Sequence, residues 1–175
     1  VIGIDLGGMS AKAALLSGNK LEGKSRVVTS AQNTPEQTAL SLAELAVQTA
    51  EKAGKSMNDI QAIGIGSPGV INSSEGTVVS WTNFNWRDVP LGALVEKYTG
   101  KKTFVLNDAN AAALGEAKFG AGKAYSDSVL ITIGTGIGSG IIIGGKLFEG
   151  FRSAGSELGH TIIRMHGEQC SCGRK

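Results

Sequence analysis

Short apolar runs separated by glycine turns open the chain. The runs Val1–Leu6, Ala11–Leu16 and Leu21–Thr29 predict strands, and the turns between them fall at Gly7-Gly8 and at Gly18-Asn19. Glycine is the residue that tolerates the backbone angles of tight turns. The N-terminal part of the chain is therefore expected to be a set of β-hairpins.

A helix follows, marked by apolar residues at helical spacing. Thr34 is the expected N-cap, Gln37 would complete a capping box with it, and Gly54 is the expected stop. The predicted inward face consists of Leu42, Leu45, Ala46, Thr49 and Ala53.

The middle of the chain alternates between strands and helices. The expected strand segments are Ile60–Gly66, the hairpin Val70–Ser80 and Thr103–Leu106, and the expected helices are Leu91–Tyr98 and a segment that begins at Asn107-Asp108 and ends near Phe119. This alternation predicts an α/β fold with a mixed sheet flanked by helices.

A polar connector of small residues, Gly120–Ser126, is the expected domain boundary. It divides the chain into a first lobe over residues 1–122 and the start of a second lobe over residues 123–175. After it come a strand at Val129–Ile133, a glycine-rich turn at Gly134–Gly140 and a return strand at Ile141–Ile143.

The second lobe repeats the pattern of the N-terminus. Two similar tetrapeptides are Gly18-Asn19-Lys20-Leu21 and Gly144-Gly145-Lys146-Leu147. Each of them follows a strand, a glycine turn and a second strand. We interpret this as a duplicated structural unit.

Composition narrows the class of partner. Of 175 residues, 26 are glycine, which implies many tight turns or close backbone approaches to a ligand. The net charge is +2 with scattered Lys and Arg, so no nucleic acid or membrane partner is expected.

Asp5 interrupts the opening apolar run too early for a signal peptide, and the two cysteines are badly spaced for a disulfide, so a cytoplasmic location is expected.

The first glycine turn carries groups suited to a polyphosphate. Gly7 and Gly8 leave backbone N–H groups accessible, and Ser10 or Lys12 can reach phosphate oxygens. Asp5 would repel phosphate unless a cation lay between them, which implies Mg²⁺ held through water. The alternative is an ordinary hairpin with a surface lysine.

The second glycine turn does not fit a dinucleotide-binding loop. Given Gly134 and Gly136, that loop would require glycine where Ser139 stands. It would also open a helix, whereas Ile141–Ile143 is a strand former. A Walker-type phosphate loop is absent from the sequence as well.

Asp108 is the candidate general base, because it follows a strand and begins a helix. Active residues of α/β folds gather at the carboxyl ends of strands. An aspartate there could accept a proton from a sugar hydroxyl during phosphoryl transfer, although aspartate is also one of the commonest helix caps. Asn107 and the turn Ser67-Pro68-Gly69 add polar groups, and Asn83 lies between Trp81 and Trp86 in a loop that would suit a sugar or simple packing.

A histidine and two cysteines near the C-terminus form a possible zinc site. His160, Cys170 and Cys172 supply three ligands, whereas structural zinc takes four. A pair of free thiols on a surface loop is the alternative, and His166 is a further possible ligand.

Several ordered motifs resemble the ROK family, and within it the bacterial glucokinases. They are Asp5-Leu6-Gly7-Gly8, Gly64–Gly69 (GIGSPG), Asn107–Glu116 (NDANAAALGE), Gly134–Gly138 (GTGIG), Glu157-Leu158-Gly159-His160 and Cys170-Ser171-Cys172-Gly173. The resemblance covers essentially the whole chain. It implies an actin-like, ribonuclease H-like fold of two lobes, with a hexose and MgATP bound in the cleft.

The resemblance also implies roles for individual residues. Asp108 would be the catalytic base for a sugar hydroxyl, and one ring nitrogen of His160 would bind zinc while the other faces the sugar. The implied sugar contacts are Gly69, Asn83, Asn107, Asp108, Glu157 and His160. The implied nucleotide and Mg²⁺ contacts are Asp5, Gly7, Gly8, Ser10, Lys12, Thr135 and Gly136. The implied zinc ligands are His160, Cys170 and Cys172.

Two departures from the family pattern bear on function. Met9 stands where the family usually has threonine, which removes a hydroxyl beside the phosphates. The family pattern C-x-C-G-x-x-G-C-x-E is cut before its third cysteine, so the second lobe is expected to be truncated, the zinc ligand set incomplete and the fragment inactive by itself. Such a fragment is expected to expose apolar surface.

The resemblance leaves some assignments open. We expect the hexose to be glucose and the protein to form a homodimer. The alternative function is the sugar-sensing domain of a ROK-type transcriptional repressor, which would carry a DNA-binding helix-turn-helix ahead of this domain. The first strand begins at Val1, which is expected to leave no room for it.

Overall fold

The computed structural model describes every residue of the chain except Thr135, Ala154 and Ser171, and it divides into two compact units, Val1–Asp108 and Ala109–Lys175. The division falls at the start of helix α3 (Asp108–Phe119), ahead of the polar connector. Helix α3 belongs to the second unit because strand β10 (Ile137–Ile143) packs closely on it from Ala109 onward. The functional division proposed at residues 122 and 123 stays a prediction.

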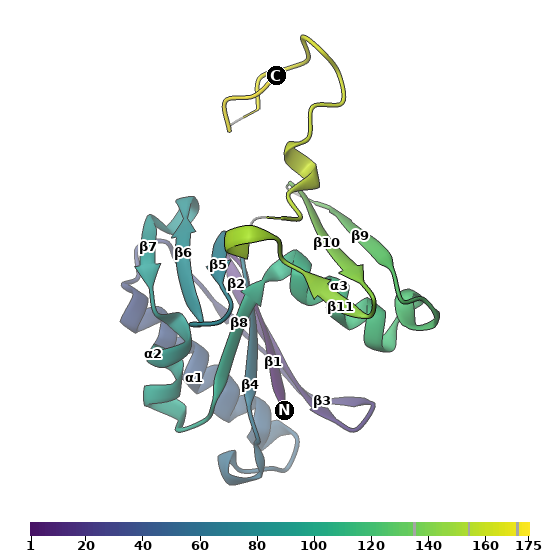
Figure 1. Cartoon of the computed structure of the whole chain (residues 1–175). Helices are drawn as coiled ribbons and strands as arrows, with labels where there is room; N and C mark the ends of the chain where they lie inside the picture. The colour runs from purple at the N-terminus through teal and green to yellow at the C-terminus, as the bar shows by residue number, and fades with distance from the viewer. Residues whose placement is uncertain (135, 154, 171) are drawn as a thin grey trace. The chain divides into compact units, whose positions relative to one another are not determined.

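The first unit is built on a mixed sheet with the strand order β3-β2-β1-β4-β8 (Figure 1). Its strands are β1 (Ile2–Leu6), β2 (Ser10–Ser17), β3 (Lys20–Val28), β4 (Ile63–Ser67) and β8 (Thr103–Asn107). The pairs β1–β2 and β2–β3 are antiparallel, as the predicted hairpins require. The pairs β1–β4 and β4–β8 are parallel, which places their carboxyl ends at one edge of the sheet.

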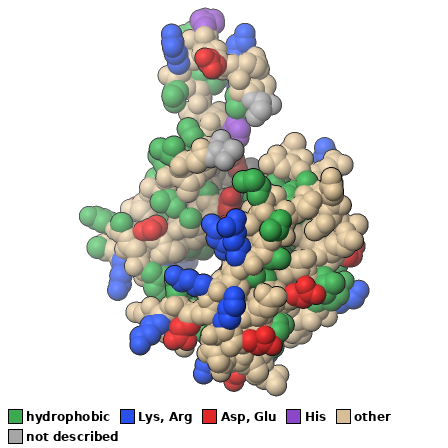
Figure 2. Space-filling view, turned by 180° about the vertical axis from the view of Figure 1, so that it is seen from behind, with side chains coloured by type: hydrophobic (Ala, Val, Ile, Leu, Met, Phe, Trp, Pro, Cys, Tyr) green, Lys and Arg blue, Asp and Glu red, His purple; other side chains and the backbone are tan. Residues whose placement is uncertain are grey.

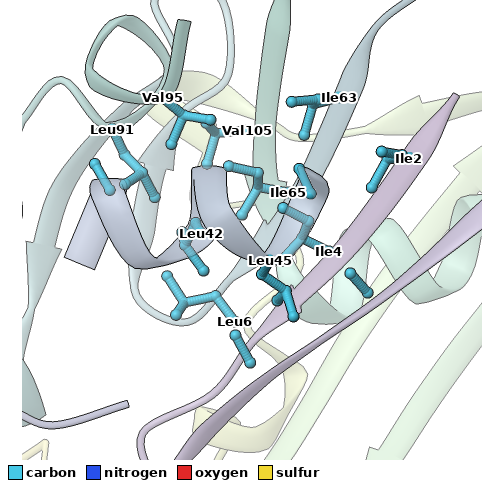
Figure 3. Packing of buried hydrophobic residues seen from close by; sticks show 14 of the residues in the cluster. Ile2, Ile4, Leu6, Leu42, Leu45, Ile63, Ile65, Leu91, Val95 and Val105 are labelled. Carbon is cyan, nitrogen blue, oxygen red and sulfur yellow. The ribbon is translucent and has the colours of Figure 1, made fainter. Parts of the chain in front are cut away.

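One face of this sheet is covered by helices α1 (Pro35–Lys52) and α2 (Leu91–Thr99). Alternate strand residues point into the core, among them Ile4 and Ile65, and they meet Leu42 and Leu45 of α1 (Figure 3). Helical spacing is the pattern from which α1 was predicted, and the strands, predicted as apolar runs, show period-two burial.

The predicted start and stop of α1 are confirmed, and α2 also ends at a glycine. The Thr34 hydroxyl accepts a hydrogen bond from the Gln37 amide at 3.2 Å, and the Gln37 side chain accepts one from the Thr34 amide at 2.8 Å, so the capping box is complete. Gly54 and Gly100 follow α1 and α2 with positive φ angles of 67° and 64°, the conformation that glycine adopts at low cost.

A second, antiparallel sheet of this unit has the strand order β5-β6-β7. Its strands are β5 (Val70–Asn72), β6 (Thr77–Trp81) and β7 (Trp86–Val89). The first two form the hairpin predicted over Val70–Ser80, and a short 3₁₀ turn, Thr82–Phe84, joins β6 to β7.

The second unit contains α3 and an antiparallel sheet with the order β11-β10-β9. Strand β9 is Ser128–Ile133 and β11 is Lys146–Phe148. The turn expected over Gly134–Gly140 is shorter than predicted, because β10 already begins at Ile137. Gly138 and Gly140 are strand residues whose missing side chains let β10 lie against Ala109 and Ala113 of α3.

The predicted repeat of the strand pattern is confirmed in the structure. Like β1, β2 and β3, the strands β9, β10 and β11 form an antiparallel meander. Each meander ends in a hairpin with a two-residue connection, where Ser17 pairs with Lys20 and Ile143 pairs with Lys146. Gly18 and Gly144 take positive φ angles of 58° and 56° at the same place in the two turns.

Strand β9 and the two ends of β10 expose apolar side chains. Val129, Ile131 and Ile133 alternate along β9 with 54–85% of their surface exposed, and Ile137 and Ile143 on β10 are exposed to more than half. Exposed apolar surface was expected for this chain, and large exposed apolar patches mark contact surfaces.

Charged side chains do not segregate by sign on the face that Figure 2 shows, where Lys and Arg are interspersed with Asp and Glu. Among the described helices, α1 included, none combines the length and the apolar character needed to cross a membrane. The expected lack of a nucleic acid partner stays a prediction.

The close fit of β10 on α3 predicts opposite effects for two glycine substitutions. A Cβ at residue 140 would lie 2.5 Å from the Cβ of Ala113, so Gly140→Ala should lower the free energy of unfolding by about 1–3 kcal/mol. Gly115 is exposed within α3 and a Cβ there meets nothing within 4 Å, so Gly115→Ala should raise it by about 0.5–1 kcal/mol. Urea unfolding followed by circular dichroism measures both, and equal stabilities would contradict the packing.

A second prediction concerns the pH dependence of the β10–β11 hairpin. The Gly144 N–H, at 2.7 Å, and then the Ser126 hydroxyl, at 2.9 Å, donate to the Asp127 carboxylate and lower its pKa below the usual 3.8. A lowered pKa stabilises the fold fully above the unfolded value, and this contribution is lost as pH falls through the folded pKa.

Asp127→Asn should therefore be less stable than the wild type at pH 7, and the difference should vanish in strong acid. Because the carboxylate is exposed, added salt should reduce the difference. Thermal unfolding across pH checks this, and a difference that grew toward low pH would exclude the assignment.

Candidate functional site

Three parallel strands bring polar residues to one edge of the main sheet. Asp5 near the end of β1 pairs with Gly66 on β4, and Ser67 at the end of β4 pairs with Asn107 at the end of β8. Asp108 follows directly as the first residue of α3. The predicted base and the predicted metal-facing carboxylate thus belong to the same edge of the Val1–Asp108 unit.

Lys12 lies across from Asp5. The two residues are directly paired in the antiparallel β1–β2 ladder, and both side chains are exposed. Residues opposite one another in such a ladder project from the same face of the sheet. This edge therefore presents a carboxylate and an ammonium group side by side.

Asn107 connects this edge to the turn that follows β4. Its side-chain amide donates to the Gly69 carbonyl oxygen at 3.2 Å. Gly69 has a φ of 93°, and a Cβ there would lie 2.2 Å from the Ser80 carbonyl oxygen. Only glycine fits at this point, so backbone packing alone explains why residue 69 is glycine, without reference to a ligand.

The first glycine turn is held from both sides by main-chain and side-chain bonds. The Gly7 amide donates to the Ser10 carbonyl at 3.0 Å, and the Thr29 hydroxyl donates to the Gly7 carbonyl at 2.7 Å. The Thr29 amide also donates to the Met9 carbonyl. Sequence reasoning missed Thr29, because its role depends on the register of β3 against β2.

The same turn is open where a ligand could approach. A Cβ at Gly8 would meet nothing within 4 Å, and the Met9 side chain is 84% exposed. Met9, which replaces the threonine of the family pattern, therefore points its apolar side chain into solvent and supplies no hydroxyl.

The second glycine turn belongs to the Ala109–Lys175 unit. The Gly134 amide donates to the Gly136 carbonyl at 2.9 Å, and a Cβ at either glycine would meet nothing within 4 Å. Thr135, a predicted nucleotide contact, lies outside the described residues. Gly136 is exposed in the turn, and its role as a nucleotide contact stays a prediction.

Asn83 is exposed on the 3₁₀ turn between β6 and β7. Beneath it Trp81 stacks on Phe84 with ring centroids 3.8 Å apart, and Trp86 meets both rings edge-on. All three rings are buried, so the tryptophans serve packing, which was one of the two alternatives. The cluster gives the loop that carries Asn83 a rigid base.

Glu157 sits at the centre of a tight turn. Its φ and ψ are −79° and 56°, and the Leu158 amide donates to the Ser156 carbonyl at 2.9 Å, which defines an inverse γ-turn. The side chain of Glu157 is exposed. A 3₁₀ turn, Leu158–His160, follows at once and places His160 close behind Glu157 in the chain.

His160, Cys170 and Cys172 come together in the second unit. Their ligand atoms all lie within 4.8 Å of one another, and Nδ1 of His160 is 3.6 Å from Sγ of Cys170. Bonds across the Cys170–Arg174 turn close the loop that carries both thiols. An imidazole and two thiols are zinc donors, and within the described residues this group supplies three of the four that a structural site takes.

The sequence profile of the ROK family matches residues 1–175. The chain belongs to the ROK family. Its fold is accordingly the actin-like α/β fold of the ROK sugar kinases, with the mixed sheet flanked by helices that the sequence predicted.

Relatives of this ROK chain include kinases and repressors. It is 38% identical to a glucokinase of Thermotoga maritima over 100% of this chain and 54% of the relative. The crystal structure of a ROK family glucokinase from Streptomyces griseus in complex with glucose and AMPPNP superposes with a TM-score of 0.80 at 36% identity, covering 99% of this chain and 54% of the other. A xylose repressor of Caldicellulosiruptor bescii is 40% identical over 75% of this chain and 33% of the relative.

The chain thus spans about half the length of the curated glucokinases that it matches. Within that span the structure gathers Asp5, Lys12, Gly69, Asn107 and Asp108 in the Val1–Asp108 unit by strand register and hydrogen bonding. Asn83 and the first glycine turn belong to the same unit. The other predicted site residues that the structure describes belong to the Ala109–Lys175 unit, and they are Gly136, Glu157, His160, Cys170 and Cys172.

Proposed function

We propose that this ROK chain is the sugar- and phosphate-binding part of an ATP-dependent hexose kinase, with glucose as the preferred sugar. The observation that carries the proposal is the shared sheet edge, where Asp5 and Asn107-Asp108 lie at the carboxyl ends of paired parallel strands. Ligand sites of α/β folds form at such edges.

Asp108 is the proposed catalytic base. Its carboxylate accepts the proton of the hexose 6-hydroxyl as that oxygen attacks the γ-phosphorus of ATP. The bond from the γ-phosphorus to the β,γ-bridging oxygen breaks, so the products are hexose 6-phosphate and ADP. Asn107 holds the loop at Gly69 beside this position through its 3.2 Å hydrogen bond.

The first glycine turn is the proposed phosphate site. Gly7 and Gly8 offer backbone amides, Ser10 and Lys12 offer side-chain donors, and Asp5 offers a carboxylate that would hold Mg²⁺ through water. The open space at Gly8 and the exposed side chains of Asp5 and Lys12 fit such a group. When bound, Mg²⁺ neutralises charge on the phosphate oxygens.

Further contacts to the substrates are proposed on the same resemblance. The sugar would contact Gly69, Asn83, Asn107, Glu157 and His160, and the nucleotide would also contact Thr135 and Gly136. The exposed side chains of Asn83, Glu157 and His160 support this assignment.

Zinc at His160, Cys170 and Cys172 is proposed as a structural ion. Nδ1 of His160 faces the Cys170 thiol, which leaves Nε2 as the ring nitrogen for the sugar. A metal on one nitrogen fixes the orientation and tautomer of the imidazole. The ion would therefore orient a sugar-binding residue.

Sugar sensing within a transcriptional repressor is the second candidate function. The 40% identity with the Caldicellulosiruptor bescii repressor favours it, but that likeness covers 75% of this chain, whereas the glucokinase likeness covers all of it. Sugar binding by the full chain without any phosphoryl transfer would decide for the sensor.

The kinase proposal predicts the effect of removing the base. In a protein of the full length of the glucokinase relatives, called the full chain below, Asp108→Asn should lower kcat with glucose and MgATP by about 10²- to 10⁴-fold. The reason is that the amide cannot accept the proton. Asp88→Asn is the matched control, since Asp88 is exposed elsewhere and its φ of 49° suits asparagine equally well. A coupled ATP-consumption assay measures both.

Full activity of the Asp108→Asn variant would refute the role of this residue. Residues 1–175 assayed by themselves should show little or no turnover, because the relatives are about twice as long. Turnover near that of the full chain would contradict this part of the proposal.

The zinc proposal is tested by metal content. Purified wild-type chain should retain zinc through dialysis, and Cys170→Ser should lose most of it, because a serine hydroxyl is a poor zinc ligand. His166→Ala is the control, since His166 is exposed and lies outside the ligand group. Equal zinc content in all three proteins would rule out the site.

A further inference from the structure

A buried chain of polar side chains lies beneath Glu157. Asn110, Ser139 and Ser156 have 2%, 4% and 7% of their surface exposed. The Ser156 hydroxyl donates to Oδ1 of Asn110 at 3.1 Å. The Ser139 hydroxyl donates to the main-chain carbonyl of Ser156. These residues come from α3, from β10 and from the segment after β11.

The Ser139 hydroxyl holds the chain on both sides of Glu157. It donates to the carbonyl of Ser156, the residue before Glu157, and accepts from the amide of Leu158, the residue after it, at 3.1 Å. Those two main-chain groups also close the γ-turn centred on Glu157. One buried side chain therefore fixes the turn that projects the exposed Glu157 carboxylate.

The surrounding packing leaves this turn little freedom. A Cβ at Gly159 would lie 2.1 Å from the Ile137 carbonyl oxygen, so the segment after the turn lies directly on β10. Ser139 is flanked on the strand by Gly138 and Gly140, which fit against α3. The hydroxyl thus extends from a strand that is packed on both sides.

Removal of this hydroxyl takes one hydrogen bond from the Ser156 carbonyl and one from the Leu158 amide. Each group then keeps only the γ-turn hydrogen bond that joins the two, so the turn loses two of the three bonds that fix it. The movement available here is rotation of the Ser156–Leu158 segment, which would redirect Glu157. Loss of the network should therefore change the direction of the Glu157 side chain more than it changes the packing of the core.

We infer that Ser139, supported by Ser156 and Asn110, is a positioning residue that sets the orientation of Glu157 toward the hexose. This inference rests on the proposed function for the identity of the ligand. It adds residues of α3 and β10 to the determinants of sugar affinity, although none of them need touch the sugar.

The first test follows the turn itself and needs no ligand. Ser139→Ala should accelerate amide hydrogen exchange at Leu158 by about tenfold or more, while amides within β9 and β10 keep their protection. Ser128→Ala on β9 is the matched control, because its hydroxyl has no part in the network. Unchanged exchange at Leu158 would overturn the inference.

The second test follows the sugar. In the full chain, Ser139→Ala should raise KM for glucose by about tenfold, with KM for ATP unchanged, because only the sugar-facing carboxylate is displaced. Ser139→Thr keeps the hydroxyl and suits a strand, so it should restore both the exchange rate and KM. An equal rise in both KM values, or no rescue by threonine, would indicate a merely structural role and overturn the inference.

The two tests separate this inference from the proposed function. If the wild-type full chain neither binds nor phosphorylates hexoses, the proposed function fails, whereas exchange at Leu158 still decides whether Ser139 fixes the turn. If exchange responds and glucose KM does not, the orientation of Glu157 does not govern sugar affinity and the inference fails.

Discussion

The parallel pairing of β1, β4 and β8 is the constraint on which the candidate site depends. Ile4 and Ile65 are paired neighbours that both face α1, and Val105 continues the row on β8. A slip of one residue would turn these buried side chains to the open face, so burial fixes the register. With the register fixed, Asp5 and Asn107 must end at the same edge.

Sequence patterns identified this framework because its determinants are local. The capping box of Thr34 and Gln37, the stop at Gly54 and the two-residue hairpins depend on residues a few positions apart, and the structure has them as predicted. Helical spacing identified most of the α1 side chains that enter the core in the same way. The α/β class followed from the order of these elements.

The part that sequence reasoning missed depends on long-range contacts. Asn110 and Ser156 are 46 positions apart, and Ser139 and Leu158 are 19 apart, so no local pattern marks them as partners. The extent of β10 was misjudged for the same reason, since Gly138 and Gly140 look like turn residues until α3 is placed against them. Thr29 became visible only once β3 was paired with β2.

Composition alone could not distinguish the glycines that close packing requires from those that it does not. At Gly69, Gly140 and Gly159 a side chain would clash with backbone or side-chain atoms, so glycine there serves close packing within the protein. At Gly8 and Gly136 a side chain would meet nothing, and neither has the positive φ that would require glycine. Glycine at these two open turns is explained by neither packing nor backbone angle, and close approach of a ligand to the main chain is a physical reason that accounts for both.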